Sequence, residues 1–523
     1  MWRASVTNDS RFKRAIIIDS EPLTIQFEGK SLTAFEGETV AATLLANGID
    51  FTRSSAISDS TRAPYRMMGA CFIVGARPAG MAAARVAASL DIDTLVLDDQ
   101  PSSGGQIYRG IKNANSELLK VLGPEYVHGR HLLTEMDHPS ICVQARTTVW
   151  QISDDGTVYY TSPEKTSAVH GEQTIIATGA LERPMPFPGW TLPGVMTAGG
   201  IQIALKTAGL IPDKEFVLAG SGPLLLLLAR QIIDAGGDLS AVVETTPSSN
   251  KRAAMKILPG IFRSKKMLRD GIGLIGVLRK HKIPHFRQAT SLSAIGEKSI
   301  EGLRFESKGS TQELPCKLLG IHTGVVPDVQ ITRQLELIHD WQPDQHCWYP
   351  RVNEHGKTDR DWLRVAGDGG GIVGAAAAEL QGMIAAWSVA HSLGRTDIKT
   401  ANTMIKAARK QLAPLQSARK FVDRLYAPSQ EFLTPANDTI VCRCEEVTAG
   451  DIRHFVDLGC LGPNQTKTFG RPGMGPCQGR YCGLTVSELI ADQRQVPVSE
   501  VGYFRIRPPV KPITLAELAS LDN

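Results

Sequence analysis

Two stretches of the chain repeat one pattern, in which a short apolar run is followed by a glycine turn and an apolar helix. In the first, the run Cys71–Val74 leads into Gly75-Ala-Arg-Pro-Ala-Gly80 and an alanine-rich stretch over Met81–Leu90. Another apolar run, Thr94–Leu97, follows and ends at Asp98. Short apolar runs that alternate with helical patterns predict parallel strands joined by helices. This stretch therefore predicts a βαβ unit.

The second stretch begins with the apolar run Phe216–Ala219 and passes through Gly220-Ser-Gly-Pro223 into a helix that reaches Ala235. The run Ala241–Val243, followed by Glu244, completes a second βαβ unit. We therefore expect an α/β protein with two tandem Rossmann-type dinucleotide-binding domains, arranged as in disulfide reductases.

Patterns outside these units mark further regions. Residues Leu23–Phe27 and Lys30–Ala34 predict two strands, Glu38–Asn47 predicts a helix, and Thr400–Leu433 is helical and basic. The expected division is an N-terminal ferredoxin-like segment at 1–71, a first dinucleotide-binding domain at 72–205 and 317–399, a second at 206–316, a helical connector at 400–434 and a cysteine-bearing domain at 435–523.

Composition narrows the class of protein. The chain has 523 residues, of which 42% are hydrophobic and 21% charged, values typical of folded globular proteins. The net charge is only +4 without a dense Lys/Arg run, so we expect neither nucleic acid nor an anionic membrane as a partner. Met1–Ile18 lacks a signal-peptide core, and the most apolar run is far shorter than the ~20 residues of a membrane helix. These features predict a cytoplasmic protein without a membrane span.

The first glycine turn carries an altered dinucleotide fingerprint. In such a fingerprint, glycines form the tight turn and let the pyrophosphate approach the backbone, and an acidic residue binds the ribose. Gly75, Gly80 and Asp98 fit, but Arg77 occupies the second glycine position, where a side chain crowds the pyrophosphate although a guanidinium also bonds phosphate. Two interpretations stay open. Either a dinucleotide, FAD first among them, binds with Arg77 near its phosphates, or the pocket is empty or differently filled.

The second glycine turn is incomplete in another way. It has Gly220 and Gly222, but Leu225 stands where a third glycine is expected. An occupied pocket would take an adenine nucleotide, with Glu244 on its ribose. The alternative is a Rossmann scaffold that holds no ligand.

Nine cysteines in a chain of 523 residues are too sparse for a disulfide framework, but four of them lie within the last hundred residues. They are spaced as Cys442-x-Cys444 and Cys477-x4-Cys482, with a glycine-rich stretch before the second pair. Four thiolates suit either a 2Fe-2S cluster or tetrahedral zinc. The one-residue spacing of the first pair is unusual for zinc and favours the cluster, and glycines let backbone N–H groups approach its sulfides.

Several longer motifs carry a resemblance to a known family. They are Gly104–Arg109, Ala177–Pro184, Phe187–Gly194, His322–Pro327, Ala366–Asp368, Cys442–Cys444 and Gly473–Cys482. Through them almost the whole chain resembles the larger flavoprotein subunit of bacterial amino-acid and opine oxidases. That group includes the larger subunit of opine (octopine or nopaline) oxidase, the hydrogen cyanide synthase flavoprotein subunit, a D-hydroxyproline dehydrogenase subunit and the sarcosine oxidase alpha subunit.

The resemblance implies more cofactor contacts than the fingerprints do, namely Gly105, Gln106, Thr178, Gly179, Gly367 and Asp368. Asp368 also suits a cap of the helix that follows it, and the two roles are compatible. The four-cysteine region resembles a 2Fe-2S domain of the bacterioferritin-associated-ferredoxin type, and FMN is implied at a subunit interface. The N-terminal segment resembles the first half of a 2Fe-2S ferredoxin-like module. Arg66 stands where a cysteine is expected and only Cys71 is near, so we interpret this segment as a truncated remnant.

The function implied is the electron-transfer flavoprotein and iron-sulfur subunit of a heteromeric opine oxidase, which cleaves octopine or nopaline to arginine and a 2-oxo acid. A smaller FAD-containing oxidase subunit would bind and oxidise the opine, and a membrane-associated acceptor could take the electrons. Alternatives are a related subunit for D-hydroxyproline, sarcosine or glycine, a self-sufficient NAD(P)H-dependent reductase, and a scaffold with decayed nucleotide pockets. No catalytic residue for the substrate can be assigned from the sequence.

Overall fold

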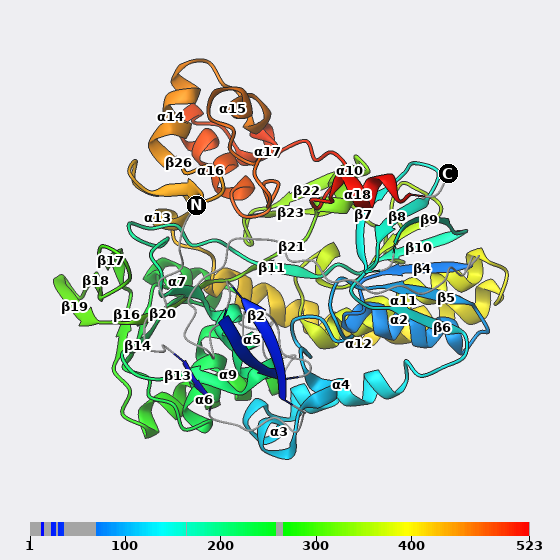
Figure 1. The fold of residues 1–523 in the computed structure, drawn as a ribbon, viewed down its shortest axis with the longest axis horizontal. Helices are drawn as coiled ribbons and strands as arrows, with labels where there is room; N and C mark the ends of the chain where they lie inside the picture. Colours follow the sequence, from blue (N-terminus) through cyan, green and yellow to red (C-terminus); the bar gives the residue numbers. More distant parts are fainter. Residues whose placement is uncertain are drawn as a thin grey trace.

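Two parallel five-stranded sheets form the body of the molecule, and a small C-terminal domain lies above them (Figure 1). The computed structural model describes residues 12–14, 22–27, 30–35, 70–163, 165–257 and 265–521. The first sheet has the strand order β24 (Leu363–Val365), β10 (Gln173–Ile176), β4 (Cys71–Val74), β5 (Thr94–Leu97) and β6 (Ile141–Gln144). Strands β4 and β5 are buried throughout, as expected for the centre of a parallel sheet.

Helices cover the first sheet because its strands are apolar on both faces. Helix α2 (Pro78–Ala88) follows β4 through the glycine turn and packs against α11 (Ala375–Ser392). Small residues permit this close approach, since a Cβ atom on Gly382 would overlap the backbone of Ala79. The alanine-rich composition of α2 is therefore explained by helix packing.

The second sheet has the strand order β12 (Val195–Thr197), β20 (Leu318–Thr323), β14 (Phe216–Ser221), β15 (Ala241–Glu244) and β16 (His285–Arg287). It carries the helices α5 (Ala198–Ala208), α6 (Pro223–Asp234) and α9 (Lys265–Lys280). Strands β12 and β20 lie on either side of the range 206–316, so this sheet takes in residues beyond that expected range. One apolar core runs from α2 and α11 to α5 and α6 and joins the two units.

Smaller elements link the units to one another. Strand β11 (Ala180–Glu182) pairs with β21 (Val325–Pro327), so the segments that follow β10 and β20 lie side by side. The hairpin of β22 (His339–Gln342) and β23 (Cys347–Pro350) lies under the C-terminal domain (Figure 1). The long helix α12 (Ile398–Leu425) corresponds to the expected helical connector and contains Pro414.

The N-terminal segment is described in part. Strands β2 (Pro22–Phe27) and β3 (Lys30–Phe35) form the expected antiparallel pair. Strand β1 (Phe12–Arg14) pairs with β13 (Leu210–Pro212) of the second unit. The helix expected over Glu38–Asn47 and the position of Arg66 lie outside the described residues.

The C-terminal domain contains the strands β25 (Ile440–Cys442) and β26 (Val447–Thr448) and the helices α14 (Ala449–Asp457), α15 (Pro463–Gly470), α16 (Gly483–Arg494) and α17 (Val498–Val501). After α17 the chain leaves this domain and reaches the first unit, where α18 (Leu515–Ala519) lies near the strands β7 to β9 (Figure 1). The fold class expected from the sequence is confirmed. Among the described residues, no helix is both long and apolar enough to cross a bilayer.

Candidate functional site

The four C-terminal cysteines come together as two pairs. The Cys442 thiol at the end of β25 hydrogen-bonds with that of Cys482, directly before α16, and the thiols of Cys444 and Cys477 also interact directly. Within the described part of the chain, no three His, Cys, Asp or Glu side chains are grouped as ligands of one ion. All four thiols are close enough to interact, and four thiolates are the ligand set of a 2Fe-2S cluster as well as of a tetrahedral zinc ion.

Backbone N–H groups support negative charge on the Cys442 sulfur, whereas the hydrogen bond with Cys442 and burial raise the pKa of Cys482. The Cys482 thiol and the N–H groups of Gly473, Glu445 and Cys444 hydrogen-bond to the Cys442 sulfur. These bonds lower the pKa of Cys442 to about 6, although burial acts in the opposite direction. Cys442 and Cys482 are each only 1% exposed, whereas Cys444 and Cys477 are partly exposed. The site therefore has a buried side and a side that faces solvent.

Three glycines near the cysteines, Gly473, Gly475 and Gly479, pack too closely against neighbouring residues to carry a side chain. A Cβ atom on Gly473 or Gly479 would lie 2.7 Å from the ring of Phe504, and one on Gly475 would overlap Cys444. The hydroxyl of Tyr503 donates a hydrogen bond to the Gly479 carbonyl oxygen at 3.2 Å. Two adjacent aromatic residues therefore hold the cysteine loop from behind, while Gly473 also directs its N–H toward sulfur.

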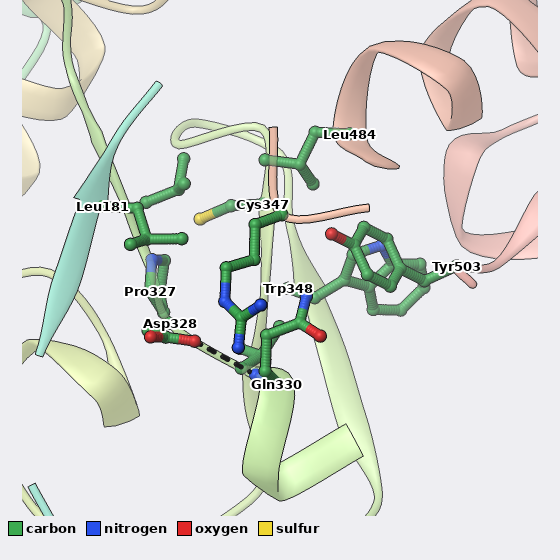
Figure 2. Close-up of a pocket in the computed structure, with 11 residues that line it drawn as sticks. Leu181, Pro327, Asp328, Gln330, Cys347, Trp348, Leu484 and Tyr503 are labelled. Atoms are coloured by element: carbon green, nitrogen blue, oxygen red, sulfur yellow. Dashed lines mark hydrogen bonds between the residues drawn. The ribbon is translucent and has the colours of Figure 1, made fainter. Parts of the chain in front are cut away.

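A small cavity of about 10 Å³ lies between the cysteine domain and the body of the molecule (Figure 2). Leu484 and Tyr503 line it from the cysteine domain, and Pro327 and Gln330 line it from the body. Arg480, two residues before Cys482, lines this cavity and a second one at the first glycine turn. The cysteine domain packs on the body of the molecule at this point, where Leu484 belongs to one apolar cluster with Val326 and Trp348.

The first glycine turn has the backbone of a dinucleotide fingerprint. Gly75 has a φ of +107°, and a Cβ atom there would lie 2.6 Å from the Ala177 carbonyl oxygen. A Cβ atom on Gly80 would overlap the Gly75 carbonyl oxygen, which is the close helix–strand packing expected of the third glycine. The second glycine position differs, because the Arg77 side chain lies against Gly105 and Gly179.

Asp98 follows β5, as expected, and its carboxylate already accepts hydrogen bonds from the protein backbone. Its two carboxylate oxygens accept the N–H groups of Ala76 at 2.5 Å and Gln100 at 2.8 Å. The residue is 3% exposed, and this burial raises the pKa of Asp98. The ribose contact expected of Asp98 and the place of Arg77 near phosphates stay predictions.

The other residues expected to contact a cofactor lie near this turn, and several of them form hydrogen bonds within the protein. Gln106 accepts a hydrogen bond from Lys206 Nζ through its carbonyl oxygen at 3.0 Å, and Thr178 donates one to the Asp328 carbonyl oxygen at 3.1 Å. Gly367 packs on α2 through Ala79. Asp368 Oδ1 accepts the N–H groups of Val373 and Gly374 at 2.9 Å, just before α11, whose N-cap Gly374 has no side-chain cap. This bonding differs from the helix cap considered for Asp368, and its cofactor contact stays a prediction.

The second glycine turn lies over a buried acid–base pair. A Cβ atom on Gly220 would overlap the His322 carbonyl oxygen, and one on Gly222 would lie 3.3 Å from the His322 ring. His322 Nδ1 is 2.6 Å from the Glu182 carboxylate. Glu244, expected to bind a ribose, lies 3.0 Å from His285 Nε2. Its role toward a nucleotide stays a prediction.

Three features of this region were not expected from the sequence. They are the contact of Arg480 with both cavities, the ion pair of Lys511 with Asp99, and the Glu182–His322 pair. Arg480 could have been suspected because it stands between Cys477 and Cys482 in the sequence. The role of Lys511 could not be predicted from the sequence, since it is an isolated lysine outside every motif.

Comparison with known proteins adds to this geometry. The family model described as pyridine nucleotide-disulphide oxidoreductase matches residues 69–394, and the sarcosine oxidase A3 domain matches residues 436–521. An opine oxidase subunit of Rhizobium meliloti is 41% identical over 473 residues, which cover 89% of this chain and 90% of that protein. The chain belongs to this family of opine oxidase subunits.

The chain is also similar to a subunit of another enzyme and shares its fold with a solved structure. Hydrogen cyanide synthase subunit HcnB of Pseudomonas protegens is 30% identical and covers 86% of this chain and 97% of that protein. The solved structure of L-proline dehydrogenase from P. horikoshii shares the fold, with a TM-score of 0.70, 18% identity and coverage of 97% of this chain and 99% of that one. The family is one of oxidoreductase subunits with flavoprotein-type Rossmann domains, as the sequence predicts.

This opine oxidase family member also matches the 2Fe-2S iron-sulfur cluster binding domain over residues 20–85. Cys71 is the one cysteine in that range of the sequence. It lies fully buried at the start of β4, and burial raises the pKa of its thiol to about 12. Residues 20–85 therefore contain a single thiol, which is buried. The matched range ends within α2 of the first Rossmann unit.

Proposed function

We propose that this chain is the electron-transfer subunit of a heteromeric opine oxidase. Its relatives are subunits of larger enzymes, which supports the same for this chain, and the four neighbouring thiols support a 2Fe-2S cluster on Cys442, Cys444, Cys477 and Cys482. The observation that carries the proposal is the packing of the cysteine domain on the body of the molecule, where Leu484 joins Val326 and Trp348 in one apolar cluster and Arg480 lines the cavity at the first glycine turn.

The substrate would be octopine or nopaline, bound mainly by a smaller FAD-containing partner subunit. Removal of two electrons and two protons from the C–H and N–H bonds of the secondary amine gives an imine. Water then adds to the imine, and arginine and a 2-oxo acid leave. A flavin, which we place as FMN at the interface with the partner subunit, and the 2Fe-2S centre would together divide the electron pair into single electrons.

The residues of this chain would hold the cluster and shield one side of it from water. The N–H groups of Gly473 and Glu445 stabilise charge at the Cys442 sulfur, and Phe504 keeps the loop in shape. Burial of Cys442 and Cys482 excludes water on one side. The partly exposed pair Cys444 and Cys477 leaves the opposite side open to an acceptor, which could be membrane-associated.

The test is co-expression with the product of the adjacent gene, followed by an opine-dependent dye-reduction assay. We expect dye reduction with octopine or nopaline that needs both chains and is lost in the variant Cys477→Ser. The panel includes D-hydroxyproline, sarcosine and glycine, and a preference for one of these would replace the opine assignment with a related dehydrogenase. NAD(P)H oxidation by the chain alone would instead support a self-sufficient reductase that uses the Glu244 pocket.

A further inference from the structure

The Arg77 side chain occupies the cradle in which a dinucleotide would place its pyrophosphate. Gly105 and Gly179 line this cradle with φ values of +61° and +67°. Arg77 Cγ is 2.6 Å from where a Cβ atom of Gly105 would be, and its Nη1 is 2.8 Å from the same point on Gly179. The second position of such a fingerprint is normally glycine so that the pyrophosphate can approach the backbone. Here a side chain of the protein fills that space.

A C-terminal segment of the chain occupies the part of the pocket where the ribose would bind. We define the C-terminal arm as residues 507–513, between α17 and α18. Lys511 Nζ forms an ion pair with Asp99, beside the Asp98 carboxylate, whose two oxygens already accept backbone N–H groups. The interaction with Lys511 lowers the pKa of Asp99 to about 2 against the opposing effect of burial. A ribose would have to displace both sets of contacts.

The arm is anchored through the backbone of Val510. The N–H of Val510 donates to the Trp150 carbonyl oxygen at 2.8 Å, and Arg480 Nη2 donates to the Val510 carbonyl oxygen at 2.7 Å. Val510 is 1% exposed. Figure 1 shows this segment crossing from the C-terminal domain to the first Rossmann unit. The arm is therefore part of the packed structure of this unit.

The space that remains suits solvent. The cavity bounded by Gly75, Arg77, Thr178, Arg480 and Lys511 measures about 40 Å³. In this measure a single water needs about 10–15 Å³, so about three waters fit. A dinucleotide with its two nucleosides and pyrophosphate does not.

We propose that the first Rossmann pocket of this chain is closed to dinucleotides by Arg77 and the C-terminal arm. The guanidinium stands where phosphate charge would be, close enough to Asp98 and Asp99 to interact with both carboxylates. The first unit then serves as a scaffold that supports the cysteine loop, and the flavin of the complex belongs to a surface shared with the partner subunit. This inference concerns the pocket alone and does not depend on which substrate the complex oxidises.

The test measures nucleotide content and binding with the full chain produced without its partner. After heat release and chromatography, the wild type should contain no FAD, NAD or other adenine dinucleotide, and added FAD should leave its unfolding temperature unchanged. FMN is counted separately because it is not a dinucleotide. The double variant Arg77→Gly/Lys511→Ala should bind about one equivalent of an adenine dinucleotide per chain. The control is Arg85→Ala, on the same helix but paired with Glu135, which should behave as wild type.

Two results would overturn the proposal. One is a wild-type chain with close to one equivalent of bound adenine dinucleotide, or with an unfolding temperature that rises with FAD. The other is a double variant that folds, judged by circular dichroism, and still binds none. If the double variant does not fold, the wild-type measurements alone decide the matter.

Discussion

His346 Nδ1, in the turn between β22 and β23, lies 2.8 Å from the Glu488 carboxylate on α16. This contact joins the cysteine domain to the body of the molecule, and Glu488 is only 7% exposed. We expect Glu488→Ala to destabilise the docking by about 1–3 kcal/mol, since it leaves a half-buried imidazole without its partner. Thermal unfolding and limited proteolysis between the domains measure this. Glu500→Ala, which removes an exposed pair with Arg494, is the control and should change little.

The iron content tests the cysteine assignment. The anaerobically purified chain should contain about two irons and two acid-labile sulfides. Cys477→Ser should lose most of both, because one iron would lack a thiolate. Cys460→Ser should keep them, since Cys460 is a buried cysteine of the same domain that belongs to neither pair. Zinc in place of iron would show that the site is a structural zinc site.

A second substitution tests the N-terminal segment. Cys71→Ser should leave the iron content unchanged, because Cys71 is fully buried in β4 and a cluster needs four ligands. The hydroxyl in an apolar site should lower the stability by about 1–3 kcal/mol. Iron analysis and thermal unfolding give the two readings. Loss of a whole cluster's iron would mean that residues 20–85 bind a cluster despite their single cysteine.

Lys206 predicts a pH dependence of stability. Its Nζ contacts Gln106 O, the Gln202 side chain and the ring face of Tyr126 but no carboxylate. Burial, with a smaller contribution from the positive charge of Arg109, lowers the pKa of Lys206 from 10.5 to about 7. Between these two values the unfolded chain holds a proton that the folded chain does not, so this group makes stability rise with pH across that window.

The slope from this one proton is about 1.4 kcal/mol per pH unit. Denaturant unfolding of the wild type between pH 7 and 9 should show it, and Lys206→Met should remove it. Lys120→Met, an exposed lysine on α3 (Ser116–Leu122), is the control and should keep the slope. Equal slopes in the wild type and Lys206→Met would contradict the prediction.

Local patterns predicted much of the fold. The apolar run Cys71–Val74 and the following glycines give β4, the turn and α2, because burial on both faces requires a continuous apolar strand. The cysteine spacing likewise placed Cys442 and Cys482 in one site. The start of α2 was expected at Met81 but lies at Pro78, since Pro is well suited to the first turn of a helix.

Contacts between distant residues were not predictable in this way. Arg77 could be recognised as unusual, but its direction depends on Gly105 and Gly179, which are brought near by the sheet. The ion pair of Lys511 with Asp99 joins positions 412 residues apart, and nothing in the sequence of either neighbourhood specifies the other. Such pairings follow from tertiary packing, which single-sequence patterns do not encode.

The distance of 412 positions between Asp99 and Lys511 also sets an order of events during synthesis. The first Rossmann unit is made as far as the end of α11 at Ser392 before the arm at 507–513 is synthesised, and domains generally fold as units as they emerge. Its glycine turn is therefore complete while Asp99 still lacks its lysine. A nascent or prematurely terminated chain that stops before Val510 would present this turn to the cell in a state that the finished protein does not show.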